Sequence, residues 1–496
     1  MSKAVDVPLL PELTRWVKEQ GGIWSDSLEV RSGSRGRGVF AAVPIKKGEL
    51  LGKLPFDLVV RATSGGPILT ELMEKGQCTT VLGMALVILH ELRVAGNRSL
   101  YFEFLAKSEL PTMPLLWPKE LLISLEGTSL ILPGASGASD TAVFEQDVLP
   151  IMEKLGKDYM PDSVRNLEAF RPALAWVMSR GLQGSLCYEY GKTCICPTLS
   201  ADAPRSEAVG PFFAPLFDLL NHTSVEAERC TKLARGENQT LEIHAHRDLE
   251  AGEEILWSYG PHPTSELLRT YGFVEHVWNP HSGLMFSLDE IKAGFLKVAT
   301  LYGRKPKNFK ARLTALEEAN RLPPAVTVFC AEEPGEMVLP EQLLTMLQVL
   351  AMTLAEYKEW VKGGCCELGQ EFLDEGSLPV VCGALLAISA SKSTRLDEAA
   401  EKATAAAATA AATAAVSPTQ AANLASELRD HEKQLLVALK KAVVKLTVAE
   451  EDVEEEGEEE ELQSDPEQEV DDAEEAQEEE KTEEAASSSA KRQRVA

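Results

Sequence analysis

The architecture of this chain can be inferred outward from residues 241–260, which read LEIHAHRDLEAGEEILWSYG. Alternating aliphatic and polar residues over 241–244, followed by an aliphatic run at 255–257, predict two β-strands. The Leu-Glu-Ala-Gly sequence that ends at Gly252 predicts a tight turn between them. This stretch therefore predicts a pair of strands in the second half of a chain of 496 residues.

A matching set of strands is expected near the N-terminus, at 28–31, 39–42 and 49–54. The turn over 45–49 reads Ile-Lys-Lys-Gly-Glu, and Leu-Glu-Ala-Gly-Glu at 249–253 repeats its aliphatic-x-x-Gly-Glu order. Each set of strands leaves an apolar face that needs a partner. We therefore expect the two sets to meet in space and bury these faces together.

Mostly helical sequence lies between the two sets of strands, over about residues 66–175. Two apolar stripes there recur at the spacing of an amphipathic helix. Their members are Leu82, Ala85, Leu86, Leu89 and Leu92 in the first stripe, and Leu167, Phe170, Leu174, Val177 and Met178 in the second. The pattern predicts an α+β fold over residues 1–280, in which a β-rich domain is split by a helical insertion.

A second domain is expected over residues 281–448, where the pattern becomes all-helical. Within it, residues 399–423 are mainly Ala and Thr, which favour helix but supply no large side chain for a core. We therefore expect an exposed insertion there. An amphipathic helix is predicted over 424–448, and the acidic tail over 449–496 is expected to be disordered.

The formal net charge of −28 is concentrated in the acidic tail. Residues 449–484 hold 22 acidic side chains and one lysine, and three basic residues follow. About −10 is left for residues 1–448, which is ordinary for a soluble protein. No basic surface for direct nucleic-acid binding is indicated, and we expect the chain to act as a monomer on a protein partner.

The nine cysteines follow no repeating interval, so free thiols in a reducing compartment are expected. Cys187, Cys194 and Cys196 lie close together in the sequence, but a structural zinc site needs four ligands and no fourth is marked. We expect no metal. The longest apolar runs, 81–89 and 378–390, are shorter than a bilayer span, and no signal peptide is apparent. The chain is therefore expected in the cytoplasm, the nucleus or both.

Three polar clusters interrupt turns or apolar sequence, where a polar group is costly to place. They are Gly36-Arg37-Gly38, Asp218-Leu219-Leu220-Asn221-His222, and Ser258-Tyr259-Gly260 with Tyr271-Gly272-Phe273 following. Taken singly, each is also consistent with a plain structural role, as a surface turn, a turn-capping Asn-His pair or a packed aromatic. None has the form of a phosphate-binding loop or a dinucleotide motif.

Taken together, and in this order, the clusters resemble the SET-domain motifs of the Rubisco large-subunit methyltransferase family. The resemblance rests on Gly36-Arg37-Gly38, Gly48-Glu49-Leu50, Met178-Ser179-Arg180, Asp218-Leu219-Leu220-Asn221-His222, Gly252-Glu253-Glu254, Ser258-Tyr259-Gly260 and Leu267-Leu268-Arg269-Thr270-Tyr271-Gly272-Phe273-Val274. It covers residues 10–280 and, more weakly, the helical region to 448, which is similar to that family's substrate-binding domain. Residues 429–436 resemble its final helix.

The resemblance implies a protein methyltransferase that uses S-adenosyl-L-methionine. The implied cofactor-binding residues are Gly36, Gly38, Glu49, Leu50, Leu51, Arg180, Asp218, Asn221, His222, Tyr259, Tyr271, Gly272 and Phe273. Among them, Arg180 would pair with the cofactor carboxylate, for which a planar guanidinium is well suited. Asn221 and His222 would read the adenine, Phe273 would pack against it, and Tyr259 would be the catalytic residue that faces the methyl group.

The expected acceptor is a lysine of another protein, histone or non-histone, with Leu182 and Tyr259 as substrate-binding residues. The same family includes members that resemble an actin-histidine methyltransferase, which carry a polar amide two residues after the arginine. Here that position is Leu182, whose aliphatic side chain suits a lysine stem. A histidine methyltransferase and a non-catalytic scaffold that binds basic proteins through the acidic tail remain as alternatives.

Overall fold

The computed structural model describes residues 9–94, 100–130, 143–182, 211–236, 240–303, 308–369, 373, 376–409 and 416–448. The described residues up to Leu446 form one compact unit. The three clustered cysteines and the predicted disordered tail over 449–496 lie outside the described residues. The tail and the domain boundary at residue 280 therefore stay predictions.

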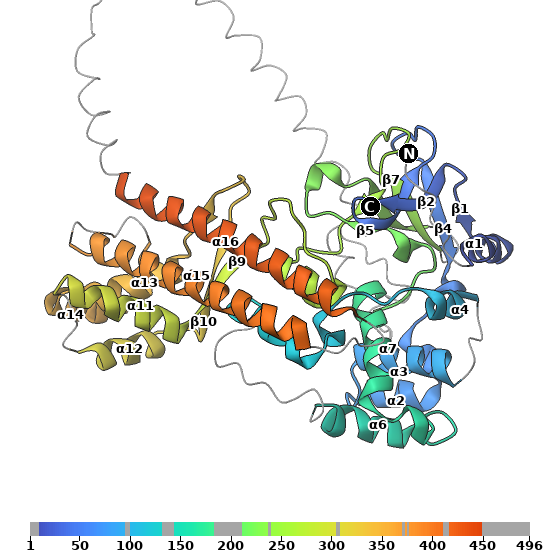
Figure 1. Cartoon of the computed structure of the whole chain (residues 1–496), viewed down its shortest axis with the longest axis horizontal. Helices are drawn as coiled ribbons and strands as arrows, with labels where there is room; N and C mark the ends of the chain where they lie inside the picture. Colours follow the sequence, from blue (N-terminus) through green and yellow to red (C-terminus); the bar gives the residue numbers. More distant parts are fainter. Residues whose placement is uncertain are drawn as a thin grey trace, which may run out of the picture. The chain divides into compact units, whose positions relative to one another are not determined.

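The N-terminal part is built on a four-stranded antiparallel sheet in the order β1-β4-β7-β6. Its strands are β1 (Ile23–Trp24), β4 (Leu50–Pro55), β7 (Thr240–Ala245) and β6 (Thr231–Gly236). Leu50 of β4 pairs with His244 of β7, so strands from the two predicted β-rich halves lie side by side, blue beside green in Figure 1. This pairing confirms that the two halves meet.

Two smaller strand pairs complete this part. The hairpin of β2 (Leu28–Gly33) and β3 (Gly36–Ala41) is antiparallel, whereas β5 (Asn221–His222) and β8 (Leu256–Trp257) run parallel. Bridges from Phe40 to Glu254 and from Ile45 to Leu249 join the early hairpin to the late strands. Both predicted turns have a left-handed glycine, Gly48 with φ 88° and Gly252 with φ 86°, which explains the glycine in each.

Helices of the predicted insertion pack beside this β-rich part, and a short helix precedes it. They are α1 (Leu10–Glu19), α2 (Pro67–Glu74), α3 (Thr80–Arg93), α4 (Leu100–Lys107), α6 (Leu149–Lys154) and α7 (Leu167–Arg180). Side-chain caps from Thr79 and Asn166 begin α3 and α7. The apolar stripes of α3 and α7 belong to the same core as the strands, so the insertion is part of the domain.

The C-terminal region is mainly helical, as predicted. After α10 (Thr264–Tyr271), its helices are α11 (Leu288–Leu301), α12 (Phe309–Glu318), α13 (Glu341–Ala351), α14 (Leu354–Lys362), α15 (Leu378–Thr409) and α16 (Pro418–Val448). It also holds a three-stranded sheet that the sequence did not reveal, made of β9 (Gly283–Ser287), β10 (Ala325–Cys330) and β11 (Met337–Val338). These strands are short and lie between strong helical patterns, which explains why periodicity missed them.

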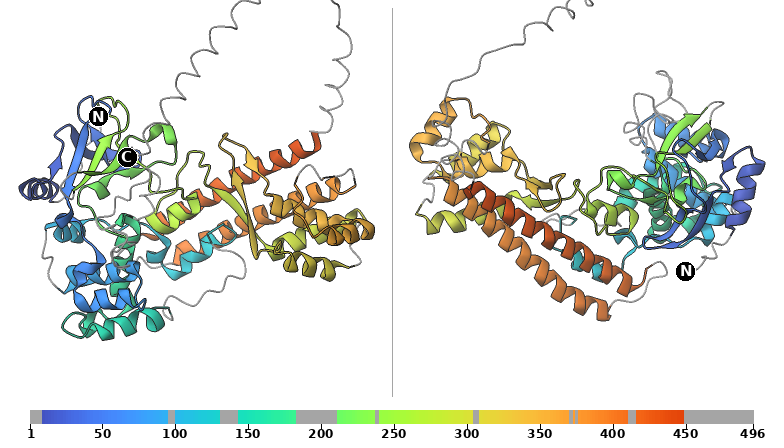
Figure 2. Two further views of the ribbon diagram at one scale, coloured as in Figure 1. Left: turned by 180° about the vertical axis from the view of Figure 1, so that it is seen from behind. Right: turned by 90° about the horizontal axis from the view of Figure 1, so that it is seen from above.

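The exposed Ala-rich insertion expected over 399–423 stays a prediction, and the structure describes 399–409 and 416–423 of it. Residues 399–409 continue α15, which runs side by side with α16 in both views of Figure 2. Ala399 and Ala421 are buried, at 1% and 0% exposure. Some of these small side chains therefore contribute to packing, whereas Glu401, Lys402 and Ala405 are exposed.

A buried ion pair joins α15 and α16 to the N-terminal part. Lys392 Nζ lies 3.1 Å from Glu432 Oε2, and the two side chains are only 1% and 2% exposed. Lys392 also donates to the Gly127 carbonyl at 2.9 Å, while Glu432 accepts from the Ser129 amide. Each charge is therefore held by its partner and by backbone from the N-terminal part, which makes the contact specific.

Replacing Lys392 with Met should lower the free energy of unfolding by about 3–5 kcal/mol, because the Glu432 carboxylate would stay buried without its partner. The double variant Lys392→Met with Glu432→Leu should recover most of this loss, since both charges are then removed. Urea unfolding measures both effects.

Lys402→Met is the matched control, because Lys402 lies on the same helix and pairs with Glu126 at 2.9 Å while both side chains stay about half exposed. It should cost no more than about 1 kcal/mol. Equal losses for Lys392→Met and Lys402→Met would contradict the role given to the buried pair.

Candidate active site

The candidate site forms where β5 and β8 lie parallel. Asn221 pairs with Leu256, and His222 pairs with Trp257. Tyr259 follows β8 directly, and its amide donates to His222 Nδ1 at 2.9 Å. Two motifs that are far apart in the sequence are thereby fixed next to each other.

His222 holds Tyr259 through a neutral imidazole. Because Nδ1 accepts from the Tyr259 amide, the ring hydrogen lies on Nε2, which is 3.0 Å from Ser224 Oγ. Burial lowers the pKa of His222 to about 3, with further lowering by His262 and Arg229. Both ring nitrogens are engaged within the protein, so the imidazole acts in positioning and does not remain free to read a base.

The Asn221 side chain is also committed to the protein. Its Nδ2 donates to the Arg37 carbonyl and to Glu254 Oε1, both at 2.8 Å. A Cβ at Gly38 would overlap this Glu254 carboxylate and the Asn221 amide. The glycine at position 38 is therefore required by the close approach of protein side chains, whereas contact of its backbone with a cofactor stays a prediction.

Arg180 and Asp218 form a second buried pair beside Tyr259. Arg180 ends α7, and its Nη1 lies 3.0 Å from Asp218 Oδ2, which also accepts from the Tyr101 hydroxyl at 2.8 Å. The Asp218 side chain is 0% exposed, yet its Oδ1 has no hydrogen-bond partner among the described residues. The pair therefore presents one unsatisfied carboxylate oxygen to the site.

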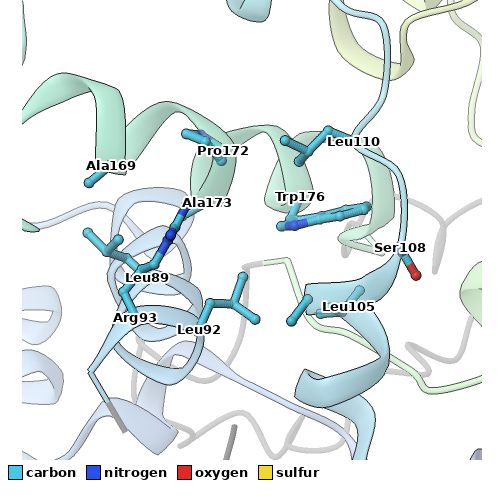
Figure 3. A pocket seen from close by; sticks show the side chains of 11 residues that line it. Leu89, Leu92, Arg93, Leu105, Ser108, Leu110, Ala169, Pro172, Ala173 and Trp176 are labelled. Atoms are coloured by element: carbon cyan, nitrogen blue, oxygen red, sulfur yellow. The ribbon is translucent and has the colours of Figure 1, made fainter. Parts of the chain in front are cut away.

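Trp176, one turn before Arg180 on α7, supports its guanidinium. The Arg180 Cζ atom lies 4.9 Å from the Trp176 ring centroid. Trp176 also forms a wall of a separate pocket of about 220 Å³, which Figure 3 shows between α3, α4 and α7, with Leu105 and Ala173 nearby. That pocket contains none of the residues that the sequence predicted for the site.

The aromatic residues predicted for the site do gather. The Tyr259 ring centroid lies 4.6 Å from that of Tyr271, 5.1 Å from that of His222 and 6.4 Å from that of Phe273. Gly272 lies between Tyr271 and Phe273 and ends α10 with φ 81°. A Cβ atom at this position would overlap the backbone of Thr112. This glycine turns Phe273 back toward His222.

Two cavities are lined by residues of this aromatic cluster. The larger one, of about 400 Å³, is lined by Ser34, Arg35, Asn221, His222, Phe273, Val274, Glu275, His276 and Val277. The smaller one, of about 20 Å³, is lined by Ser179, Arg180, Gly181, Leu182, Asp218, Leu220, Trp257, Tyr259 and Tyr271. Because His222 lines the first and contacts Tyr259 of the second, ligands in the two cavities would meet near the phenol.

Four predicted cofactor residues lie outside this cluster. Glu49 is exposed and accepts from the Lys46 amide at 3.3 Å, and Leu50 belongs to β4. Leu51 is 0% exposed in the core, so its side chain faces no cavity. Gly36 lies at the exposed end of the β2–β3 hairpin, beside the lining residues Ser34 and Arg35. The geometry therefore supports ligand contact for Gly36 more than for Glu49, Leu50 or Leu51.

Sequence reasoning missed two residues of this site. Tyr101 lies on α4 and reaches Asp218 from more than a hundred positions away, with no local signal in the sequence. Arg37 stands inside the quoted Gly36-Arg37-Gly38 motif, but only its glycines were considered. Arg37 is half-buried, and its charge acts on Arg180 and Tyr259, so an arginine inside a glycine motif was the available signal.

Among the described residues, no group of His, Cys, Asp and Glu has the arrangement of a metal site. The described helices also include none that is long and apolar enough to cross a membrane.

Comparison with known proteins shows what this arrangement resembles. Residues 36–260 match the SET domain family. The chain is 25% identical over 382 residues to N-lysine methyltransferase SETD6 of Mus musculus, which covers 74% of each protein. It is 26% identical over 276 residues to Ribosomal lysine N-methyltransferase 4 of Saccharomyces cerevisiae, covering 52% of this chain and 54% of that one. Actin-histidine N-methyltransferase of Rattus norvegicus is 26% identical over 360 residues, which cover 71% of this chain and 54% of that protein.

The fold is shared with solved structures. The structure of Rubisco LSMT bound to AdoMet matches with a TM-score of 0.57 at 16% identity, over 92% of this chain and 97% of that chain. The SET domain of LSMT bound to Lysine and AdoHcy matches with a TM-score of 0.56, over 89% of this chain and 92% of that chain. At this identity the match establishes a common architecture, which includes the helical C-terminal region.

The buried neutral His222 predicts a specific loss of stability in acid. Its pKa is lowered in the folded state, so below pH 6.5 the unfolded chain binds a proton that the folded chain does not. This residue should therefore lower the free energy of unfolding by roughly 2 kcal/mol between pH 6.5 and pH 5. Urea unfolding at pH 7.5 and pH 5 measures the change.

The His222→Asn variant should be less stable than the wild type at pH 7.5. Its free energy of unfolding should, however, fall by less between pH 7.5 and pH 5. The exposed His246, replaced by Asn, serves as the control and should follow the wild type. Parallel losses in the wild type and in His222→Asn would show that His222 is not the responsible group.

Proposed function

Because the chain belongs to the SET-domain methyltransferase family, in its Rubisco LSMT-like branch, we propose that it methylates a lysine side chain of another protein with S-adenosylmethionine. The observation that carries the proposal is that Tyr259 lines the smaller cavity while its ring lies 5.1 Å from that of His222, which lines the larger one. A donor in the larger cavity and an amine in the smaller one would meet at its phenol. The lysine specificity of SETD6 and of the yeast ribosomal enzyme supports the same acceptor.

The residues of the larger cavity fit the methyl donor. Phe273 offers an aromatic face for a purine, and Asn221 and His222 leave their backbone groups for its polar edge, since their side chains are engaged within the protein. The volume of about 400 Å³ lies in the range of small-molecule sites. The donor also carries a carboxylate, for which the buried guanidinium of Arg180 at the smaller cavity is suited.

The donor, when bound, supplies a methyl group on a positively charged sulphur. The task of the protein is then to align the lysine nitrogen with the sulphur–carbon bond and to exclude water. A free lysine has a pKa of about 10.4, so deprotonation at pH 7.4 costs about 4 kcal/mol. The narrow cavity around Leu182 and Tyr271 would desolvate the ammonium, which lowers its pKa toward neutrality.

Tyr259 would orient the amine without removing its proton. Burial raises the pKa of its phenol above the ordinary value, although Arg180 and Arg37 act in the opposite direction. The hydroxyl donates to the Leu220 carbonyl at 2.8 Å, so its oxygen is fixed and can accept from an amine N–H. A phenol that stays protonated is a hydrogen-bond partner and is unsuited as a general base near neutral pH.

The side chain at position 182 favours a lysine acceptor over a histidine acceptor. Leu182 is buried, pairs with Phe212 and lines the narrow cavity. An aliphatic wall packs against a lysine stem but cannot hold one tautomer of an imidazole. The competing observation is Trp257, which lines the same cavity and has a buried indole N–H without a partner among the described residues. An acceptor histidine could use that donor, so a test must identify the modified residue type.

We also propose that the protein acts as a monomer in the cytoplasm, the nucleus or both, without direct contact to nucleic acid. The net charge of −28 supports the last point, because it opposes approach to a phosphate backbone. A non-catalytic scaffold is the second candidate, and calorimetry with S-adenosylmethionine separates the two. Absence of binding would favour the scaffold.

Incubation with labelled S-adenosylmethionine and whole lysate should label protein, and Tyr259→Phe should lower the rate by roughly 10²-fold or more, as loss of a positioned polar group in an active site commonly does. Mass spectrometry of the labelled protein identifies the residue. Tyr302→Phe is the control, because Tyr302 is 56% exposed at the end of α11 and should leave the rate unchanged. Full activity of Tyr259→Phe would remove the phenol from the mechanism.

Leu182→Asn should shift preference from lysine toward histidine, because the amide would provide a partner for an imidazole and would weaken packing against the lysine stem. The measurement compares matched peptides that differ only in the acceptor residue. Leu182→Met, which keeps an apolar wall of similar volume, should keep the lysine preference. Equal preference in Leu182→Asn and the wild type would mean that another residue selects the acceptor.

A further inference from the structure

Cys365 and Cys366 are adjacent residues that follow α14, the helix labelled at the far end of the C-terminal region in Figure 1. The structure describes six cysteines, all of them free thiols, and four of the six are buried. Cys365 is half-buried and Cys366 is exposed. Among the described residues, the two thiols within reach of a reagent in solution are therefore neighbours in the chain.

Hydrogen bonds and an ion pair fix the backbone around the two cysteines. The Cys365 amide donates to the Trp360 carbonyl at 3.0 Å, and Trp360 Nε1 donates to the Cys366 carbonyl at 2.9 Å. The Cys365 carbonyl accepts from Arg321 Nε at 3.4 Å, and the Arg321 guanidinium pairs with Glu367 at 2.8 Å. Both thiols are thus carried by one well-anchored loop.

Cys365 has a left-handed backbone, with φ 56°. This conformation is uncommon for a residue other than glycine and persists where the surrounding contacts impose it. Gly364, directly before it, has φ 89°, so two left-handed residues in succession lead into the pair. Unfavourable backbone of this kind is concentrated at functional sites, and here it coincides with the two accessible thiols.

The two thiols differ in the reactions that are open to them. Cys366 is exposed, so its thiolate can approach an electrophile in solution. Cys365 packs against the apolar cluster of Leu316, Trp360 and Leu368, and burial raises the pKa of its thiol. Cys366 is therefore suited to attack first, and Cys365 is suited to react with its neighbour once the Cys366 sulphur is activated.

We propose that Cys365 and Cys366 form a reversible oxidation site that reacts with a small-molecule disulfide. The Cys366 thiolate attacks one sulphur of the reagent, which forms a mixed disulfide and releases one thiolate. The Cys365 sulphur then attacks the Cys366 sulphur, the second thiolate leaves, and a disulfide joins the two residues. In total the two cysteines lose two electrons and two protons, and the reagent is reduced to two thiols.

The adjacency of the two residues makes their disulfide easy to reduce. Consecutive Cα atoms are about 3.8 Å apart, which is shorter than the separation of about 4.4–6.8 Å that disulfides usually span. A bridge between neighbours is therefore strained, and a strained disulfide is more readily reduced. The reaction needs neither a methyl donor nor a protein substrate, so the inference goes beyond the proposed function and is independent of it.

The competing explanation is that Cys366 is an accessible thiol and Cys365 is a packing residue without chemistry of its own. The reagent would then stay attached to Cys366 as a mixed disulfide. The two explanations therefore differ in the product, which is an internal disulfide in one and a retained reagent in the other.

The test incubates the full chain with oxidised glutathione, blocks the remaining thiols and cleaves after glutamate, which gives residues 360–367 as a peptide with no other cysteine. Mass spectrometry should find this peptide with two hydrogens lost and no glutathione attached. Cys365→Ser should instead retain glutathione on Cys366 in at least about tenfold higher yield than the wild type, because the neighbouring thiol with its high effective concentration is gone. Cys365→Gly, which suits the left-handed backbone, gives the same test if the serine variant does not fold.

Cys366→Ser should leave the peptide almost unmodified, because the half-buried Cys365 is a poor first nucleophile. Cys330→Ser is the control, since Cys330 is only 6% exposed, and it should give the same product as the wild type. Excess reduced glutathione should restore both thiols of the wild type. Retention of glutathione by the wild type as in Cys365→Ser, absence of any reaction, or a bridge that resists reduction would each overturn the proposal.

Discussion

The antiparallel pairing of β4 with β7 is the constraint on which the site depends. It joins backbone near residue 50 to backbone near residue 244, with the whole helical insertion between them in sequence. Closing so long a connection costs conformational entropy, which burial of the shared core has to offset. Once these strands are paired, the β2–β3 hairpin and the β5–β8 pair are brought together, and Gly38 can approach Asn221.

Between these paired strands, the polar groups of the site are fixed by hydrogen bonds and an ion pair with one another. His222 fixes the Tyr259 backbone, Asn221 links Arg37 to Glu254, and Asp218 binds both Arg180 and Tyr101. Each of these bonds is at least partly buried, where an unpaired group is costly, so the network resists rearrangement. Such rigidity suits a reaction in which alignment, rather than acid–base chemistry, is the main requirement.

The C-terminal region is anchored through charge as well as packing. Lys392 and Glu432 use backbone atoms of the N-terminal part, and Arg429 donates to the Ser124 carbonyl. A buried ion pair adds little net stability compared with apolar side chains, but it penalises every arrangement in which the charges separate. The same segment, Arg429–Leu436, carries the sequence resemblance to the final helix of the family. Its polar residues are thereby explained as the contacts that orient this region.

The sequence by itself determined the elements and the motifs. Alternating apolar residues and turn glycines predicted the strands, and apolar stripes at 3.6-residue spacing predicted α3 and α7. The order of the motifs indicated the candidate site residues Gly38, Arg180, Asp218, Asn221, His222, Tyr259 and Phe273. Only the tertiary structure decided which groups are already engaged. It committed the His222 ring to Tyr259, engaged the Asn221 side chain with Arg37 and Glu254, and continued α15 through residues 399–409. The physical reason is that periodicity reports local backbone preference, whereas hydrogen-bond satisfaction depends on contacts between residues far apart in the chain.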